Sequence, residues 1–427
     1  MFKKTIITFL SNMTGNQIIA LLIFIVTYLG IIFNKLPFIN LDRKAFAFVG
    51  AVLMIVCGVI DFDFAIQSID FNTIVLLLGM MIIISVLKFD GFFEFISYTT
   101  TSHAKNPSAL LSVIVFITGF ASAFLVNDAV VLLFTPVIIN ICRQSKLNPI
   151  PFLLGEIFSA NAGSLMTITG NPQNMIIGIA SHISYAKFMI CMLPIALLSM
   201  LVIIFVIKKT NRDIFSNKAS INISQQEKPR QDLKRMRLSL IVFGLVVLGF
   251  FFGKILGISI PVIAIAGASI ILLLSKHKSK EVLQEVDFSL LIFFASLFIL
   301  VAGIKQSGVL DFIFNISLQE NVLSVLILFA LSVLLSQLLS NVPYTVFMLP
   351  LMNVAHSEVL WLTLASASTL AGNLTIVGAM ANLIVIEEAG KENVFLSSKH
   401  FVRPAILITS ITCVLALLFS LVLLLFR

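Results

Sequence analysis

The stretch Leu125-Val-Asn127-Asp128-Ala-Val-Val-Leu-Leu-Phe-Thr-Pro136 has a counterpart later in the chain, Leu339-Ser-Asn341-Val-Pro343-Tyr-Thr-Val-Phe-Met-Leu-Pro350. In both, an Asn ends an apolar run and a Pro follows nine residues later. A second pair of motifs comes next in each half, because Thr167-Ile-Thr-Gly170-Asn-Pro-Gln-Asn174 is matched by Thr375-Ile-Val-Gly378-Ala-Met-Ala-Asn382. Since the pairs keep their order, one half is expected to be a diverged copy of the other.

The composition predicts an integral, multi-pass membrane protein. Hydrophobic residues make up 59% of the chain and charged residues 11%, whereas a soluble domain has about 25% charged residues. The apolar runs are about 16 to 22 residues long, the length that an α-helix needs to cross hydrocarbon. We expect the cell membrane as the location, and a prokaryotic inner membrane in particular. The net charge of +8 is explained by Lys and Arg in loops, so no nucleic-acid partner is expected.

The apolar runs divide into full crossings and longer, interrupted segments. The expected full spans are 17–33, 44–60, 72–89, 151–180, 187–208, 237–254, 259–275, 289–305, 358–386 and 403–426. Segments 109–141 and 322–352 are too long for one crossing, and each is predicted to be a re-entrant hairpin that enters the membrane and returns. The expected fold class is thus an all-α polytopic membrane protein. It has two inverted-topology repeats, each with five spans, one hairpin and one broken helix.

The charge distribution sets the expected domains and topology. Most of the 28 Lys and Arg residues fall in one set of loops, which the positive-inside rule assigns to the cytoplasm. Repeat 1 is expected at 17–208 and repeat 2 at 237–427, joined by a polar cytoplasmic linker, 209–236. Whether the N-terminal segment, 1–16, forms an extra membrane element is left open.

Breaks in the membrane segments indicate where a solute binds. Backbone groups that a break frees in hydrocarbon need partners, so breaks survive where they line a cavity or bind something. Asn127 and Asp128 can cap the returning arm of the first hairpin, whose free N–H groups favour negative charge. Gly170 and Pro172 unwind the broken helix 151–180. Gly378 marks the break in 358–386 less firmly, because no proline accompanies it.

Several carboxylates stand in or beside the apolar segments. Asp128 is expected in mid-membrane, where a charge costs about 3 kcal/mol or more, so it is a candidate for proton coupling. Glu156 is expected to reach the nearby cytoplasmic interface. Asp70 and Asp287 are expected to cap helices. The five His residues form no cluster, and neither a metal nor a cofactor beyond a coupling Na⁺ or H⁺ is expected.

Two hairpins with Asn at the tip, each followed by a broken helix with a Gly-x-Pro-x-Asn-like turn, resemble the ion transporter superfamily. Asn127-Asp128-Ala129 and Gly170-Asn171-Pro172-Gln173-Asn174 are most similar to its arsenite-permease and citrate-permease-like branch, which is related to divalent-anion:sodium symporters. The resemblance covers the chain from about residue 17. It implies alternating access, and a homodimer is a further expectation from such relatives.

The resemblance also implies site residues. One cation site is implied where Asn127 meets Gly170, and a second where Asn341 meets Gly378 and Ala379. Substrate would lie between them, in contact with side chains of both repeats, namely Asn127, Asp128, Thr169, Asn171 and Asn341. Dicarboxylate symporters of the superfamily carry Ser-Asn-Thr at both tips, whereas this chain has Val126 and Val342 beside the two Asn residues. This difference favours proton coupling through Asp128.

The expected function is secondary active transport of a small inorganic or organic anion or oxyanion, carboxylate or arsenite-like, driven by a proton or sodium gradient. Membrane lipid is the other expected partner. A sodium/proton antiporter of the same fold is the near alternative. A passive channel and a membrane-embedded enzyme are more distant, because discrete inverted tips do not line an open pore and no nucleophile–base pair is apparent. No enzymatic activity is expected.

Overall fold

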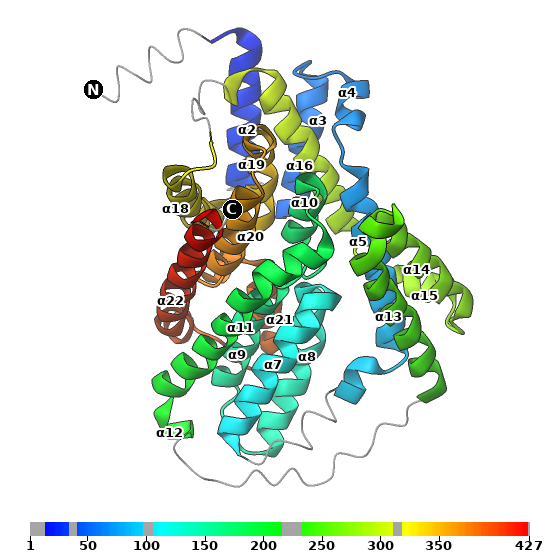
Figure 1. Cartoon of the computed structure of the whole chain (residues 1–427), viewed down its shortest axis with the longest axis vertical. Helices are drawn as coiled ribbons and strands as arrows, with labels where there is room; N and C mark the ends of the chain where they lie inside the picture. The colour runs from blue at the N-terminus through cyan, green and yellow to red at the C-terminus, as the bar shows by residue number, and fades with distance from the viewer. Residues whose placement is uncertain (1–12, 34–40, 97–105, 216–232, 311–317, 426–427) are drawn as a thin grey trace. The chain divides into compact units, whose positions relative to one another are not determined.

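The computed structural model describes residues 13–33, 41–96, 106–215, 233–310 and 318–425. The described residues are helical and include no strand (Figure 1). The first half contains α2 (Gly15–Phe33), α3 (Arg43–Val56), α4 (Phe62–Gln67), α5 (Phe71–Phe89), α7 (Pro107–Leu125), α8 (Asn127–Gln144), α9 (Ile150–Ser164), α10 (Pro172–Ser181), α11 (Tyr185–Thr210) and α12 (Arg212–Phe215). The second half contains α13 (Leu233–Leu256), α14 (Ile260–Leu274), α15 (Ser279–Gln284), α16 (Phe288–Gln306), α18 (Val322–Leu339), α19 (Asn341–Ala355), α20 (Glu358–Ala371), the 3-10 turn η1 (Ile376–Gly378), α21 (Met380–Lys391) and α22 (Ser398–Leu425).

Eight helices of the described part are long and apolar enough to cross a membrane, namely α2, α5, α7, α11, α13, α16, α18 and α22. Six of them coincide with predicted full spans, and α7 and α18 are the first arms of the predicted hairpins. The helices α14 and α20 are apolar but shorter. The all-α, multi-pass prediction is therefore confirmed. Residues 1–12, on which the question of an extra N-terminal element depends, lie outside the described residues, as do linker residues 216–232.

The predicted span 44–60 was wrong at its C-terminal end, because α3 stops at Val56. Gly58 adopts φ 70°, a left-handed conformation that ends helices and that glycine adopts without a steric penalty. The backbone N–H of Val59 then returns to the carbonyl of Met54 at 3.0 Å. Asp61 starts the short helix α4 by accepting a 2.8 Å hydrogen bond from the N–H of Phe64.

Both predicted broken helices are interrupted in the structure. The first is divided into α9 and α10, with residues 165–171 between them, and Pro172 opens α10. The second is divided into α20 and α21, with η1 in the interruption. Since a proline at the first helical position needs no donor, Pro172 starts the new helix at no cost.

The chain forms two compact units, each described here by itself. Unit 1 takes in the described parts of Met1–Ile74, Asp287–Gln319 and Val346–His356. Small residues bring its helices close together, since Gly303 of α16 packs against the side chain of Met54 in α3. The Lys44 ammonium bonds the carboxylate of Asp287 at 2.7 Å, which joins the start of α3 to the start of α16.

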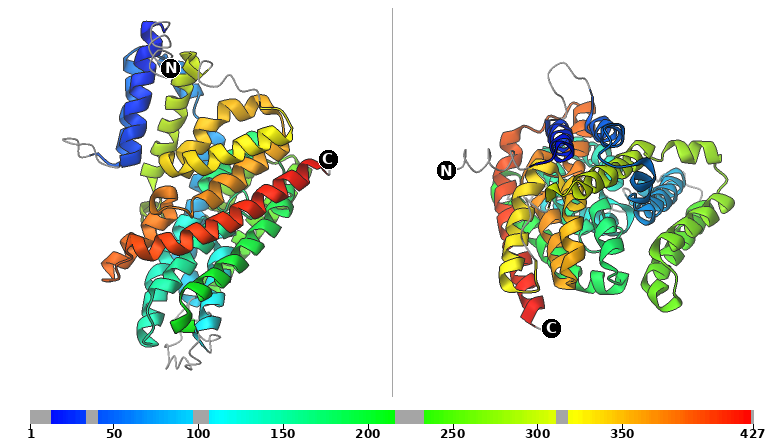
Figure 2. Two further views of the ribbon diagram at one scale, coloured as in Figure 1. Left: turned by 90° about the vertical axis from the view of Figure 1, so that its left-hand side faces the viewer. Right: turned by 90° about the horizontal axis from the view of Figure 1, so that it is seen from above.

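Unit 2 takes in Val75–Val286, Glu320–Thr345 and Ser357–Arg427 in their described parts. Within it α7, α8 and α9 lie side by side, and α21 contacts both α8 and α9 (Figure 1). Figure 2 shows the long helices α11 and α22 alongside each other. A Cβ at Gly163 would collide with the backbone of Gly119, so α7 and α9 cross with their backbones in contact. Unit 2 contains both hairpin tips and both breaks.

Candidate substrate and ion site

The two tips share an unusual backbone conformation. One residue separates α7 from α8, and one separates α18 from α19. These residues, Val126 and Ser340, have φ of 63° and 65°. Positive φ is uncommon for any residue but glycine and is a steric outlier for a β-branched residue such as Val126, and such strain persists where the surrounding structure holds it. Each hairpin therefore reverses direction at a single strained residue next to its Asn.

Asn171 and Asn174 hold the first break together. The Asn171 side chain caps α10 by accepting a 2.7 Å bond from the N–H of Asn174, and its Nδ2 donates to Ser164 Oγ at 2.8 Å. Asn174 Nδ2 donates to the carbonyls of Ser164 and Thr167, each at 3.1 Å. A Cβ at Gly170 would collide with the Ser164 carbonyl, so no larger residue fits there. The unwound carbonyls thus have partners, as a break in an apolar bundle requires.

The first tip touches the first break directly. The backbone N–H of Asn127 donates to the carbonyl of Gly170 at 2.9 Å. The Asn127 side chain is 6% exposed, and its Nδ2 donates to Asn161 Oδ1 at 3.2 Å. The structure therefore brings together Asn127 and Gly170, the two residues predicted for one cation site. That they hold a cation stays a prediction.

The second tip meets the second break in a related way. The amide nitrogen of Asn341 faces the carbonyls of Ser368 and Gly378 and donates to both at 3.0 Å. A Cβ at Gly378 would lie 2.9 Å from the Gly372 carbonyl, so this break is also closely packed. Ala379 is the N-cap of α21 and has extended backbone angles.

Asparagine side chains join the first tip to the second break. Asn161 of α9 accepts from Asn127, and its Nδ2 donates to Asn373 Oδ1 at 2.8 Å and to Asn382 Oδ1 at 2.9 Å. Asn382 in turn donates to the carbonyls of Gly372 and Thr375, at 2.8 and 2.9 Å. Buried amides of this kind are stable when their hydrogen bonds are made. Asn161 therefore links the first tip to the second break.

The other predicted site residues have different surroundings. Asp128 is half-buried in the first turn of α8, where the helix dipole favours a negative charge. The Thr169 hydroxyl lies 2.9 Å from the Tyr185 hydroxyl of α11 and thus faces that helix. The Asn171 side chain is occupied in capping α10. That these residues bind substrate stays a prediction.

Two polar residues of this site, Asn161 and Gln337, were not predicted from the sequence. Asn161 lies inside a helix whose residues from Pro151 to Ser164 are all buried, and a buried Asn in an apolar helix is the signal that could have found it. Gln337 of α18 donates to the Ala371 carbonyl at 2.8 Å and accepts from the Thr375 hydroxyl at 2.9 Å. It was the one amide in the otherwise apolar end of the second hairpin arm.

The expectation that Glu156 reaches the interface was wrong. Its side chain is 0% exposed, and both carboxyl oxygens lie 3.1 Å from the Thr135 hydroxyl of α8. Helix α9 is covered by neighbouring helices along its whole length, so the side chain has no route to a surface.

Two amide oxygens near the first break accept no hydrogen bond from the described residues. Asn127 Oδ1 and Asn174 Oδ1 are buried and have no hydrogen-bond partner among the described residues. A buried polar atom without a partner costs about 1 to 3 kcal/mol, so such atoms are rare unless something else binds them. Amide and carbonyl oxygens suit Na⁺ at unwound helices of transporters. The residues present therefore fit a small hard cation.

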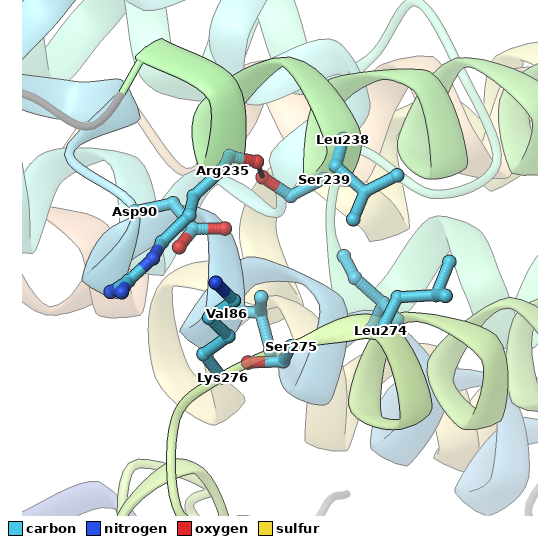
Figure 3. A pocket seen from close by; sticks show the side chains of 9 residues that line it. Val86, Asp90, Arg235, Leu238, Ser239, Leu274, Ser275 and Lys276 are labelled. Carbon is cyan, nitrogen blue, oxygen red and sulfur yellow. Dashed lines mark hydrogen bonds between the residues drawn. The ribbon is translucent and has the colours of Figure 1, made fainter.

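A separate pocket of about 190 Å³ lies between the ends of α5, α13 and α14. Figure 3 shows Asp90, Arg235 and Lys276 among the side chains that line it. The His277 ring bonds that carboxylate at 2.8 Å. No residue of a tip or a break lines this pocket, so it is distinct from the candidate site.

Comparisons with known proteins agree with this geometry. The citrate transporter family model matches residues 19–367. A 46 kDa membrane protein of Mycobacterium leprae is 30% identical over 421 residues, which cover 94% of this chain and 97% of that protein. The silicon efflux transporter LSI3 of rice, Oryza sativa subsp. japonica, is 29% identical, with 84% and 87% covered. The crystal structure of the Alcanivorax borkumensis YdaH transporter matches with a TM-score of 0.54 at 12% identity, covering 96% and 98%.

Paired helices that meet broken helices, eight candidate membrane spans among the described residues and the family match together define an integral, multi-pass membrane transporter and not an enzyme. The predicted membrane location and transport class are confirmed. The chain belongs to the citrate transporter family, as the resemblance to the citrate-permease-like branch implied.

Proposed function

We propose that the protein is a secondary active transporter that moves a small anion or oxyanion, carboxylate or arsenite-like, by alternating access. A proton or sodium gradient drives it. The observation that carries the proposal is the 2.9 Å hydrogen bond from the Asn127 N–H to the Gly170 carbonyl, because it places a hairpin tip on an unwound helix. Discontinuous helices of this kind form substrate and ion sites in transporters.

Helix N-termini supply the attraction for an anion. Helices α8, α10, α19 and α21 all begin at a tip or a break. The first turns of α10, α19 and α21 contain no acidic residue, so no negative side chain there neutralises their positive dipole ends. Asp128 occupies the first turn of α8 and makes this end suited to a proton or a cation instead. Anion and coupling ion would thus use different helix ends of one unit.

The coupling cation, where it is Na⁺, would be held by tip and break oxygens. For the first site these are Asn127 Oδ1 and the unwound backbone at Gly170, and for the second the backbone around Asn341, Gly378 and Ala379. The buried, unpartnered Asn127 Oδ1 supports the first site. Proton coupling would use the carboxyl of Asp128.

The test is uptake by proteoliposomes of the purified protein. Labelled citrate, succinate, phosphate, sulfate, arsenite, silicic acid and sodium are offered one at a time, with pH and sodium gradients imposed separately. Gradient-dependent flux of one anion or oxyanion is expected. Sodium flux driven by pH, with every anion and oxyanion inert, would overturn the proposal in favour of a sodium/proton antiporter.

A further inference from the structure

A carboxyl group is buried in the seam between α8 and α9, the two helices whose side chains meet at the first tip. Glu156 is fully buried, and its helix α9 packs against α7, α8, α11, α20, α21 and α22. Among the residues that the structure describes, the hydroxyl of Thr135 is the one hydrogen-bonding partner of this carboxyl. An ionised carboxylate in an apolar interior needs a cation or several donors. Glu156 has only the Thr135 hydroxyl beside it among the described residues.

Counting hydrogens indicates which group donates. The Thr135 hydroxyl has one proton, and its oxygen lies 2.7 Å from the Val131 carbonyl, one turn back along α8. The contact to the carbonyl is shorter than the two contacts of 3.1 Å to Glu156, so we assign the proton of Thr135 to the carbonyl, which can only accept. Under this assignment the carboxyl can bond the Thr135 oxygen only by donating, as a neutral acid.

Among the described residues, no cation forms an ion pair with Glu156. Helix α7 carries no titratable side chain. The titratable and charged residues on the other helices packed against α9 are Asp128, Cys142 and Arg143 on α8, Tyr185, Lys187, Cys191, Lys208 and Lys209 on α11, Glu358 on α20, Glu387, Glu388 and Lys391 on α21, and Lys399, His400, Arg403 and Cys413 on α22. Of the cations, Arg143 pairs with Glu392, Lys187 with Glu358 and Lys391 with Glu388.

The acid lies on the same two helices as the first tip. Helices α8 and α9 are joined by Asn127–Asn161 at the tip and by Thr135–Glu156 further along. Glu156 and Asn161 are five positions apart in α9, which corresponds to a rise of about 7.5 Å along the helix. A rearrangement of the tip that changed the packing of α8 on α9 would reach this carboxyl directly.

We propose that Glu156 is a proton carrier of the transport cycle, in addition to Asp128. In the conformation described, the carboxyl holds its proton and donates to Thr135. When the seam between α8 and α9 opens to water, the O–H bond breaks and the proton leaves to water. The Thr135 hydroxyl then turns from the Val131 carbonyl and donates to the carboxylate. This inference rests on the proposed function, because a carrier needs a transport cycle to serve.

The first test needs no substrate. Infrared spectra of the purified protein in lipid, at neutral pH, are expected to contain the carbonyl band of a protonated carboxylic acid. The band should vanish in Glu156→Gln, persist in Asp128→Asn, and shift in heavy water as the proton exchanges. A band that is absent, or one that never exchanges, would overturn the inference even if the protein transports every probe.

The second test separates coupling from structure. Gln has the shape of protonated Glu and can donate to Thr135, but it cannot release a proton. In Glu156→Gln, exchange of labelled against unlabelled probe across the membrane should continue, while accumulation driven by a pH gradient should fall at least tenfold and the rate should lose its pH dependence. The probes are citrate, arsenite and silicic acid, whichever the wild type moves. Glu281→Gln, the same chemical change at an exposed position in α15, should behave as wild type.

The outcomes are distinguishable from failure of the proposed function. Full pH-driven accumulation by Glu156→Gln would overturn the carrier role and leave the transporter intact. A wild type that moves none of the probes would defeat the proposed function, and the exchange of the carboxyl band would then decide whether Glu156 takes up and releases a proton.

Discussion

Asn161 and Asn382 lie 221 residues apart in sequence, yet the side-chain amide of the first donates to the carbonyl oxygen of the second at 2.9 Å. Through this bond the helix that contacts the first tip is tied to the second break. A single side chain thereby connects elements that the sequence assigns to different repeats.

Replacing Asn161 by Leu should disable the site. The change removes two donated bonds and one accepted bond, and it leaves the oxygens of Asn373 and Asn382 buried without those donors. We expect a loss of about 2 to 3 kcal/mol in the free energy of unfolding and at least a tenfold loss of flux, measured by thermal unfolding in detergent and by proteoliposome uptake. The matched control is Ser159→Ala in the same buried helix, where one local bond to a backbone carbonyl is lost. Equal effects of both changes would contradict the linking role.

Gly170→Ala should close the first break to transport. Its Cβ would collide with the Ser164 carbonyl, and the backbone that meets Asn127 must then shift. Because a small misplacement in a site can cost about a hundredfold in rate, uptake should fall to background. Gly244→Ala in α13 is the control, since its Cβ meets nothing within 4 Å, and Ala should stabilise that helix by up to about 1 kcal/mol. Uptake that survives in Gly170→Ala would show that the break is not part of the site.

Asp128→Asn should abolish gradient-driven flux while the protein still folds. The N-cap of α8 is Val126 and makes no side-chain cap bond, contrary to the expectation that Asn127 and Asp128 cap this arm, so the substitution removes the charge from the first turn and costs no cap. Flux is measured with imposed pH and sodium gradients, and folding by size-exclusion chromatography. Glu281→Gln, at an exposed position in α15, is the charge-matched control and should transport normally. Full coupled flux in Asp128→Asn would remove this carboxylate from the mechanism.

The ion pair between Lys44 and Asp287 should make stability depend on pH. Partial burial acts to raise the pKa of Asp287, but the hydrogen bonds from Lys44 and Ser289 and the charge of Lys44 hold that pKa below its ordinary value. A lowered carboxyl pKa contributes stability that is present above the unfolded pKa and is lost as pH falls through the folded pKa. The Asp287 side chain is 46% exposed, so solvent screening limits the contribution to about 0.5 to 1 kcal/mol.

Unfolding temperatures of wild type and Asp287→Asn measure this contribution, because Asn preserves the helix cap. The wild type should be the more stable protein at neutral pH, and the difference should disappear in acid. A difference that does not change with pH would assign the effect to the cap and not to the ion pair.

The sequence predicted those features that local chemistry determines. Gly170 and Pro172 marked the first break, and Asn127 and Asn341 marked the tips, because these residue types change backbone behaviour wherever they occur. The end of α3 at Val56, before the turn at Gly58, was missed, since an apolar run of sufficient length favoured a full span. The short helix α4 was missed because it lies between two predicted spans, in a stretch predicted to be a loop.

Partners distant in sequence could not be predicted. Asn161 has a local context of small and apolar residues, and only the folded chain places Asn373 and Asn382 beside it. Glu156 was assigned to the interface by its distance from a loop. In a helix that is buried on every side, position along the sequence says nothing about which side chain reaches water.

The crossing of α7 and α9 at Gly119 and Gly163 has a mechanical consequence. With backbone against backbone there is no layer of flexible side chains to absorb sliding, so α7 and α9 form one rigid block. In the proposed alternating-access cycle, a block that carries the tip and the break together would preserve the distances between them in both end states. A transporter built in this way should present nearly the same affinity for its solute to either face of the membrane, and the gradient alone would set the direction of net flow.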